Sequence, residues 1–296
     1  MSKEHPPQKH VPVLLDATLA RLDPQQGENY LDLTVGFGGH ASQVLERTGN
    51  YTESVLVDRD EYAIQHVSSL KTKGARLMHT DFLTAARQLT EEGKAFNLIL
   101  VDLGVSSPQL DQGERGFSFT RNGPLDMRMD RRQETSAADL IENASISELA
   151  QIIHDYGEEP YMNAKHIAEQ IVANRPFKDT ESLAAVIAAN SRGRWKRTHP
   201  ATRTFQALRI AVNDELGQVE ALLPLLPKLL KPGGRVGVIS FHSLEDRLVK
   251  RYFKDQFEAG FEAELMPLTK KPIAGATEDV HNPRSRSAKL RVAVKK

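Results

Sequence analysis

Cysteine is absent from this chain of 296 residues. The absence excludes disulfides, thiolate metal sites and a cysteine nucleophile, and it fits a reducing compartment such as the cytoplasm. Long apolar runs are also missing, since none approaches the about 20 residues that span a bilayer, so no membrane partner is expected. Residues 1–9 are polar and contain no secretory signal. We therefore expect a cytoplasmic protein whose first nine residues are disordered.

The formal net charge is zero as well, because 39 Lys and Arg residues balance 39 Asp and Glu residues. Taken alone, this balance argues against a polyanionic partner, but the distribution of charge matters more than the sum. The segments 192–209 and 282–296 are rich in Lys and Arg and contain no acidic residue. Two local positively charged surfaces are therefore predicted.

Short apolar segments with strand character recur along the chain. They are Tyr30–Val35, Val55–Asp58, Ala75–His79, Asn97–Asp102, Val236–Phe241 and Leu290–Val294. Helix-like segments separate the first four, which is typical of a parallel sheet in an α/β fold. Residues 259–280 are predicted to be a loop-rich connection.

The pattern changes between the fourth and fifth strands, where no strand signal occurs for about a hundred residues. Ser145 begins a capping box, and Asp179 can cap a second helix with apolar residues at helical spacing. We therefore predict a discontinuous sheet domain of residues 10–111 and 200–296, interrupted by a mostly helical substrate-recognition insertion at 112–199.

A glycine-rich turn directly follows the first predicted strand. Gly36, Gly38 and Ala41 match the pattern G-x-G-x-x-G/A, and a helix-like segment begins there. Such turns let a ligand approach the backbone and the free N–H groups of a helix start. Asp58 ends the next strand, where its carboxylate can bind ribose hydroxyls. A dinucleotide fits these features too, so a NAD-dependent oxidoreductase remains an alternative.

Polar residues at the other strand ends favour S-adenosyl-L-methionine over a dinucleotide. Asp32 ends the first strand, an acid and an aromatic that could bracket an adenine follow the third at 79–82, and Asp102 ends the fourth. Several strand ends thus offer polar groups to one nucleoside. A DNA amino-methyltransferase is a second alternative, but the Pro-Pro-aromatic motif common after such an acid is replaced by Leu-Gly-Val after Asp102.

Several sequence blocks resemble the bacterial small-subunit rRNA cytosine-N4 methyltransferase family. They are His10–Leu15, Thr34–His40, Leu100–Asp111, Glu114–Phe119, Gly123–Asp130, His199–Arg209, Ile239–Arg247 and Asn282–Ser287. The blocks follow the family's order and cover nearly the whole chain. One departure is Leu33, where the family usually has glycine, which puts the affinity for the cofactor in question.

The resemblance implies a Rossmann-like methyltransferase sheet with an inserted helical domain. It implies a substrate in 16S rRNA, the exocyclic amine of a cytidine in the decoding region. The partner is then rRNA within the small ribosomal subunit, and a homodimer stays open. The implied S-adenosylmethionine site comprises Gly38, Gly39, His40, Asp58, Phe82, Asp102 and Gln109.

Two residues are candidates for a direct role in the reaction. The N4 lone pair is delocalised into the ring, so oriented acceptors for the amine protons should dominate catalysis, with no metal required. Asp102 can supply such an acceptor or can position the cofactor alone. His242, just after the fifth strand, can contact the target base or bind main-chain groups.

The basic segment 192–197 surrounds the only tryptophan of the chain. Arginine and lysine bind phosphates, and an indole stacks on an unpaired base. The residues predicted to bind RNA are Arg194, Trp195, Lys196 and Arg197.

Overall fold

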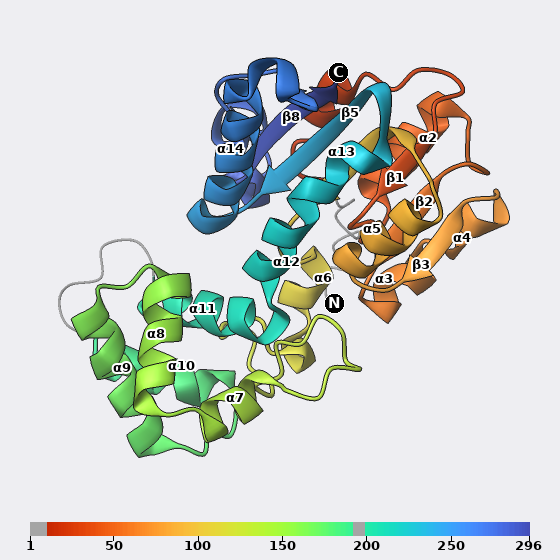
Figure 1. The fold of residues 1–296 in the computed structure, drawn as a ribbon. Helices are drawn as coiled ribbons and strands as arrows, with labels where there is room; N and C mark the ends of the chain where they lie inside the picture. Colours follow the sequence, from red (N-terminus) through yellow and green to blue (C-terminus); the bar gives the residue numbers. More distant parts are fainter. Residues whose placement is uncertain (1–10, 192–198) are drawn as a thin grey trace. The chain divides into compact units, whose positions relative to one another are not determined.

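The computed structural model describes residues 11–191 and 199–296. The chain forms two compact units. The first combines the chain up to Gly104 with Gln218–Lys296, and the second comprises Val105–Gly217. In Figure 1 the red, orange and blue parts of the chain share one sheet, whereas the green part is helical. Among the described residues, no helix combines the length and the apolar character needed to cross a membrane.

An eight-stranded sheet forms the centre of the first unit, in the order β3-β2-β1-β4-β5-β8-β6, with β7 paired to β8. The first five strands in this order are parallel, and β6, β7 and β8 are antiparallel additions. The predicted α/β class is therefore confirmed. The strands are β1 Tyr30–Asp32, β2 Val55–Asp58, β3 Arg76–His79, β4 Phe96–Asp102, β5 Leu230–Ser240, β6 Leu265–Pro267, β7 Ile273–Ala274 and β8 Lys289–Lys295.

The apolar residues of β4 show how the sheet organises two cores. Ile99 and Val101 join one buried cluster, and Leu98 and Leu100 join the other, because successive side chains of a strand point to opposite faces. Helices α5 and α14 contribute to the first cluster, and α1 and α2 to the second. Both faces of the sheet are therefore covered, which explains why its strands are apolar throughout.

The helices of the first unit precede β1 or lie in the connections between its strands. They are α1 Leu15–Leu22, α2 Gly39–Thr48, α3 Glu61–His66, α4 Ser68–Thr72, α5 Phe82–Glu91, α13 Leu226–Leu229, α14 Ser243–Glu258 and α15 Gly275–Glu278, with 3-10 turns at η2 Leu223–Leu225, η3 Gly260–Glu262 and η4 Pro283–Ser285. Residues 259–280 were predicted to be a loop-rich connection, but they contain β6, β7, η3 and α15. These elements have two to four residues each, too few to produce a recognisable periodicity.

The described part of the second unit contains helices and no strand, as predicted. It comprises α6 Ser107–Asp111, η1 Gly113–Arg115, α7 Ala137–Asn143, α8 Ile146–Gly157, α9 Tyr161–Asn174, α10 Thr180–Ala189 and α11 Ala201–Asn213, and α12 Glu215–Leu222 crosses the unit boundary. The predicted caps Ser145 and Asp179 each accept a main-chain N–H and form capping boxes.

The unit boundaries differ from the predicted 112–199. The structure assigns Val105–Gly217 to the second unit, because the buried Phe205 and Leu208 of α11 pack in the same cluster as Leu149 and Ile153. An amphipathic helix shows in its sequence that one face is buried, but not against which core.

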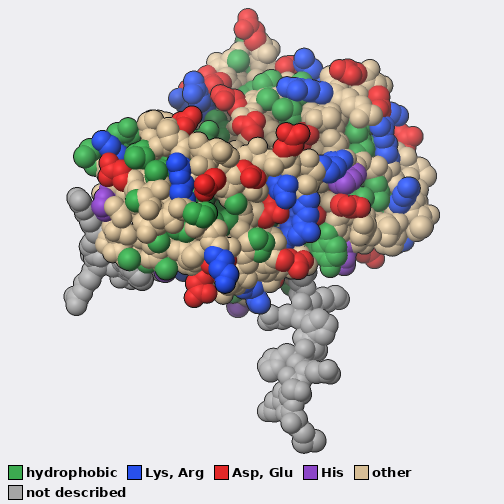
Figure 2. Space-filling view, turned by 90° about the horizontal axis from the view of Figure 1, so that it is seen from below, with side chains coloured by type: hydrophobic (Ala, Val, Ile, Leu, Met, Phe, Trp, Pro, Cys, Tyr) green, Lys and Arg blue, Asp and Glu red, His purple; other side chains and the backbone are tan. Residues whose placement is uncertain are grey.

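Acidic and basic side chains are intermixed on the face drawn in Figure 2, in keeping with the zero net charge. The predicted RNA-binding residues Arg194, Trp195, Lys196 and Arg197 lie outside the described residues, as do residues 1–9.

Candidate active site at the carboxyl edge of the sheet

The loop between β1 and α2 is tied to Asp58 at the end of β2. The Gly36 N–H donates a 2.8 Å hydrogen bond to Asp58 Oδ2, and the Asp60 N–H donates one of 2.9 Å to Oδ1. Burial raises the pKa of the Asp58 carboxyl, and these two bonds oppose the rise. Each carboxylate oxygen can accept a further hydrogen bond, so Asp58 can hold the loop and still receive ribose hydroxyls.

Gly38 and Gly39 occupy positions where a side chain would not fit. Gly38 has a left-handed backbone (φ +74°), and a Cβ there would lie 2.9 Å from Val67 Cγ1. A Cβ on Gly39 would lie 2.3 Å from Pro12 Cγ. Gly38 is the N-cap of α2 and supplies no side-chain cap, so N–H groups of the first turn are available to a ligand.

His40 in the first turn of α2 lies beside Asp102 at the end of β4, with Nε2 3.7 Å from Oδ2. Burial lowers the pKa of His40 to about 4, and both of its ring nitrogens are buried without a hydrogen-bond partner among the described residues. His40 is therefore neutral at pH 7, and the contact is not an ion pair.

Asp102 carries an unsatisfied acceptor. Its side chain keeps 25% of its surface exposed, yet its Oδ1 atom is buried and has no hydrogen-bond partner among the described residues. Burial raises the pKa of Asp102 well above its usual range, and the nearby carboxylates of Asp32 and Glu245 add to the rise. A carboxyl group with an unpaired oxygen and a raised pKa can accept hydrogen bonds or a proton from a ligand.

Asp32 at the end of β1 is held inside the protein. The Tyr30 hydroxyl donates a 2.7 Å hydrogen bond to its Oδ2, and the Thr34 N–H donates one of 3.1 Å to its Oδ1. Burial nevertheless raises the pKa of Asp32 to about 7. Sequence reasoning placed Asp32 at the cofactor but missed Tyr30, although two residues apart on one strand share a face.

Phe82 begins α5 after the end of β3. Its ring is 8% exposed and belongs to a core cluster, and Arg59 Cζ lies 5.6 Å from the ring centroid. Asp81 accepts hydrogen bonds from the Thr84 N–H and hydroxyl and caps α5. Core packing therefore explains the presence of Phe82, and capping of α5 explains that of Asp81. Contact of Phe82 with an adenine stays a prediction.

Leu33 replaces the usual family glycine without backbone strain. Its φ angle is not among the positive ones, its N–H donates to the Leu100 carbonyl at 3.0 Å, and its side chain is 1% exposed in the core. The local backbone therefore needs no glycine at this position.

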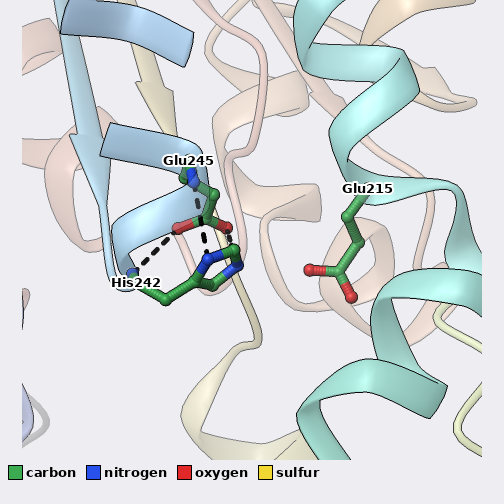
Figure 3. A group of neighbouring side chains, drawn as sticks. All are labelled: Glu215, His242 and Glu245. Carbon is green, nitrogen blue, oxygen red and sulfur yellow. Dashed lines mark hydrogen bonds and ion pairs between the residues drawn. The ribbon is translucent and has the colours of Figure 1, made fainter. Parts of the chain in front are cut away.

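His242 is the N-cap of α14, and it is paired with Glu245 (Figure 3). His242 Nδ1 accepts from the Glu245 N–H at 3.4 Å, while Glu245 Oε2 accepts from the N–H groups of Phe241 and His242. The acceptor role of Nδ1 places the ring proton of a neutral His242 on Nε2, which lies 3.1 Å from Glu245 Oε1. Sequence reasoning missed Glu245, although His-x-x-Glu has the spacing of a capping box.

The predicted cofactor residue Gln109 and the Glu215 side chain of Figure 3 belong to the second unit. Gln109 is 5% exposed, and its Oε1 accepts a 2.9 Å hydrogen bond from the Ser106 N–H. Glu215, also drawn in Figure 3, forms two 2.8 Å hydrogen bonds with Arg209.

One family accounts for nearly the whole chain. The model of the MraW methylase family matches residues 7–296. This chain belongs to the MraW methylase family. A relative in Synechocystis sp., named ribosomal RNA small subunit methyltransferase H, is 47% identical over 297 residues, which cover 97% of this chain and 93% of the relative. A relative of the same name in Acidobacterium capsulatum is 44% identical over 300 residues, covering 98% and 99%.

Among solved structures, a putative rRNA-methylase from Clostridium thermocellum is similar at a TM-score of 0.45 and 10% identity, with 95% of each chain covered. Membership of the MraW methylase family confirms the predicted methyltransferase and its S-adenosylmethionine cofactor. It does not favour the alternatives, an oxidoreductase or a DNA methyltransferase.

The residues of this family member fit the cofactor. A Cβ at Gly38 or Gly39 would collide with Val67 or Pro12, so this loop conformation requires glycine at both positions, and no side chain caps the first-turn N–H groups of α2. Asp58 retains acceptor capacity for hydroxyls, and Asp102 Oδ1 lacks a partner among the described residues. All of these groups lie at the ends of neighbouring parallel strands or in the loops that follow them, where α/β sheets bind ligands.

Proposed function

We propose that this protein transfers a methyl group from S-adenosylmethionine to the exocyclic N4 amine of a cytidine in the decoding region of 16S rRNA. The proposal rests on membership of the MraW methylase family, on relatives named ribosomal RNA small subunit methyltransferase H, and on the unsatisfied acceptor of Asp102. The last observation carries most weight, because methylation of an amine needs an acceptor for its protons.

The cofactor would be held by Gly38, Gly39, His40, Asp58, Phe82, Asp102 and Gln109. The cofactor supplies an electrophilic methyl group on a sulfonium. The loop and the N–H groups of α2 would hold its amino-acid part, and Asp58 would receive the ribose hydroxyls.

The chemical difficulty lies in the weak nucleophilicity of N4. Asp102 Oδ1 would accept a hydrogen bond from one N4–H and turn the nitrogen lone pair toward the methyl group. Transfer of the methyl group to N4 would require N4 to lose one proton. The raised pKa of Asp102 suits it to receive that proton.

His242 is proposed to contact the target base from the end of β5. Its Nδ1 accepts the Glu245 N–H, and its Nε2 lies 3.1 Å from Glu245 Oε1, so Glu245 holds the ring at the start of α14. A ring fixed in this way offers a flat surface or an edge to a base at little cost in conformational entropy.

The remaining partners follow from the proposed substrate. Arg194, Trp195, Lys196 and Arg197 would bind RNA, and the acceptor would be rRNA within the small ribosomal subunit. The protein would act in the cytoplasm, where that subunit is assembled. A homodimer stays a prediction.

Mass spectrometry of rRNA nucleosides tests the proposal. Small-subunit rRNA from cells with and without the gene is digested to nucleosides, and methylated cytidines are quantified. We expect N4-methylated cytidine to be reduced in the strain without the gene and restored by the gene on a plasmid. Unchanged N4-methylation would overturn the proposed substrate.

A further inference from the structure

A pocket of about 280 Å³ in the first unit is lined by the chain segment that connects β7 to β8. Its lining includes Ala276, Asp279, Val280, Asn282, Pro283 and Arg286. All of these come from the short segment that contains α15 and η4. The proposed catalytic groups do not line this pocket.

The strand pairing places the pocket segment at the same end of the sheet as the candidate active site. Lys289, the first residue of β8, pairs with Ser240, the last residue of β5. The Gly275 N–H donates to the Ala288 carbonyl at 2.9 Å, so both ends of the pocket segment are anchored there. β5 runs parallel to β4, and Asp102 and His242 lie at or just after the carboxyl ends of these strands.

The pocket segment is hydrogen-bonded to residues 11–14, which pack on the glycine loop. Asp279 Oδ2 accepts a 2.9 Å hydrogen bond from the Leu14 N–H, and Asn282 Nδ2 donates one of 3.2 Å to the Val11 carbonyl. Pro12, between these two residues, lies against Gly39. A single short stretch of chain therefore separates the pocket from the proposed cofactor site.

The groups facing the pocket combine apolar surface with a cation. Val280 keeps 62% of its surface exposed, and Pro283 adds a second apolar side chain. Arg286 is exposed, and its guanidinium makes no hydrogen bond or ion pair with any described residue. By contrast, Asp279 Oδ2 already accepts hydrogen bonds from the Leu14 N–H, the Ser285 hydroxyl and the Asn282 side-chain amide.

We propose that this pocket binds one unpaired nucleotide of the RNA substrate that neighbours the target cytidine. Single-stranded RNA is recognised by bases that rest on apolar or guanidinium planes and by phosphates that pair with arginine. The volume lies just below the about 300–1,000 Å³ of sites for larger small molecules, which suits one nucleotide. This inference rests on the proposed function and adds a subsite to it.

Steady-state methyl transfer to small ribosomal subunits from cells that lack the gene tests the subsite. Arg286→Ala removes the cation, and Ala276→Trp fills the pocket from an exposed position without a change of charge. Arg251→Ala is the matched control, because it removes an exposed arginine from α14, away from the pocket lining. Thermal unfolding of each variant verifies that it folds. If Ala276→Trp does not fold, Arg286→Ala, which changes an exposed residue, still tests the subsite.

We expect both pocket variants to raise KM for the subunit about fivefold or more, with KM for S-adenosylmethionine and kcat within about twofold of wild type. Arg286→Ala should also reduce the slope of log affinity against log salt by about one. Wild-type KM for the subunit in both variants, or the same increase in Arg251→Ala, would overturn the subsite. A raised KM for S-adenosylmethionine alone would assign the pocket to the cofactor and also overturn it. Failure of the wild-type protein to methylate the subunit would instead overturn the proposed function.

Discussion

The Asp102 N–H donates a 2.6 Å hydrogen bond to the hydroxyl oxygen of Thr34. Thr34 lies just after β1 and also donates its own N–H to Asp32. The ends of β1 and β4 are therefore joined by one threonine, and the main chain that carries Asp102 is fixed by a side chain from the cofactor loop.

Thr34→Val should lower methyl transfer by its effect on the position of Asp102. Valine has the shape of threonine but cannot accept the Asp102 N–H, and a main-chain donor left unpaired costs about 1–3 kcal/mol. We expect a lower free energy of unfolding in urea and a kcat reduced about tenfold. Thr34→Ser keeps the hydroxyl and should retain most of the activity. Equal kcat values for the serine and valine variants would show that this bond does not position Asp102.

Gly38→Ala should weaken cofactor binding, whereas Gly93→Ala should not. Both glycines have a left-handed backbone (φ +74° and +67°), so each alanine costs about 1–2 kcal/mol of strain. Only at Gly38 would the new Cβ meet a neighbour, Val67 Cγ1 at 2.9 Å. Calorimetric titration with S-adenosylmethionine should give a Kd at least tenfold higher for Gly38→Ala and an unchanged Kd for Gly93→Ala. A normal Kd in both variants would place the cofactor away from this loop.

Asp32→Asn should change how stability depends on pH. Burial raises the pKa of Asp32 from 3.8 to about 7, so the folded protein holds this proton more tightly than the unfolded chain. The contribution of Asp32 to the free energy of unfolding is therefore fully present below about pH 4 and is lost as the pH rises through about 7. At about 1.4 kcal/mol per pKa unit, the loss is at most about 4 kcal/mol.

Urea unfolding at several pH values between 4 and 8 measures this effect. Asparagine does not titrate, so the stability of wild type relative to Asp32→Asn should decline as the pH rises. Titrating groups that do not interact with Asp32 cancel in the difference, whereas the pKa of Asp102, which the Asp32 carboxylate raises, falls in the variant. A difference that stays constant over this range would contradict a raised pKa for Asp32.

His242→Asn should distinguish the two roles proposed for His242, the N-cap of α14 and the contact with the target base. Asparagine is a good N-cap, whereas replacement of a cap by alanine costs about 0.5–2 kcal/mol. We expect His242→Asn to keep the thermal stability of wild type and to lose activity at least tenfold, and His242→Ala to lose both. Wild-type activity in His242→Asn would show that the residue serves only as the cap.

The parallel sheet and its polar edge could be predicted from the sequence because each of those features is local. An apolar strand, a glycine turn and an acid at the strand end all fall within a few residues, as at Leu31, Gly36 and Asp58. The caps at Ser145 and Asp179 were predicted for the same reason.

What could not be predicted depends on contacts between distant residues. The bond between Thr34 and Asp102 joins residues 68 positions apart, and the assignment of α11 to the helical unit depends on which core buries Phe205. The packing of Pro12 against Gly39 and the hydrogen bond from the Leu14 N–H to Asp279 also join residues far apart in the sequence, so neither could be predicted from it. Sequence patterns reveal the need for burial or bonding, but not the partner.

Methyl transfer by Asp102→Asn tests the central claim most directly. Radiolabelled methyl incorporation into small subunits that lack the modification is measured at saturating S-adenosylmethionine from pH 5 to 9, beside the wild-type protein. Asparagine keeps the shape of the side chain but loses the carboxylate and its ability to take a proton, so kcat should fall about 10²-fold or more. KM for S-adenosylmethionine should stay within a few fold. In wild type, the fall of kcat on the acid side should occur well above the usual pKa of an aspartate, because burial raises the pKa of Asp102. A kcat near that of wild type would contradict a role of Asp102 in the reaction, and a raised KM for the cofactor with normal kcat would limit it to cofactor binding.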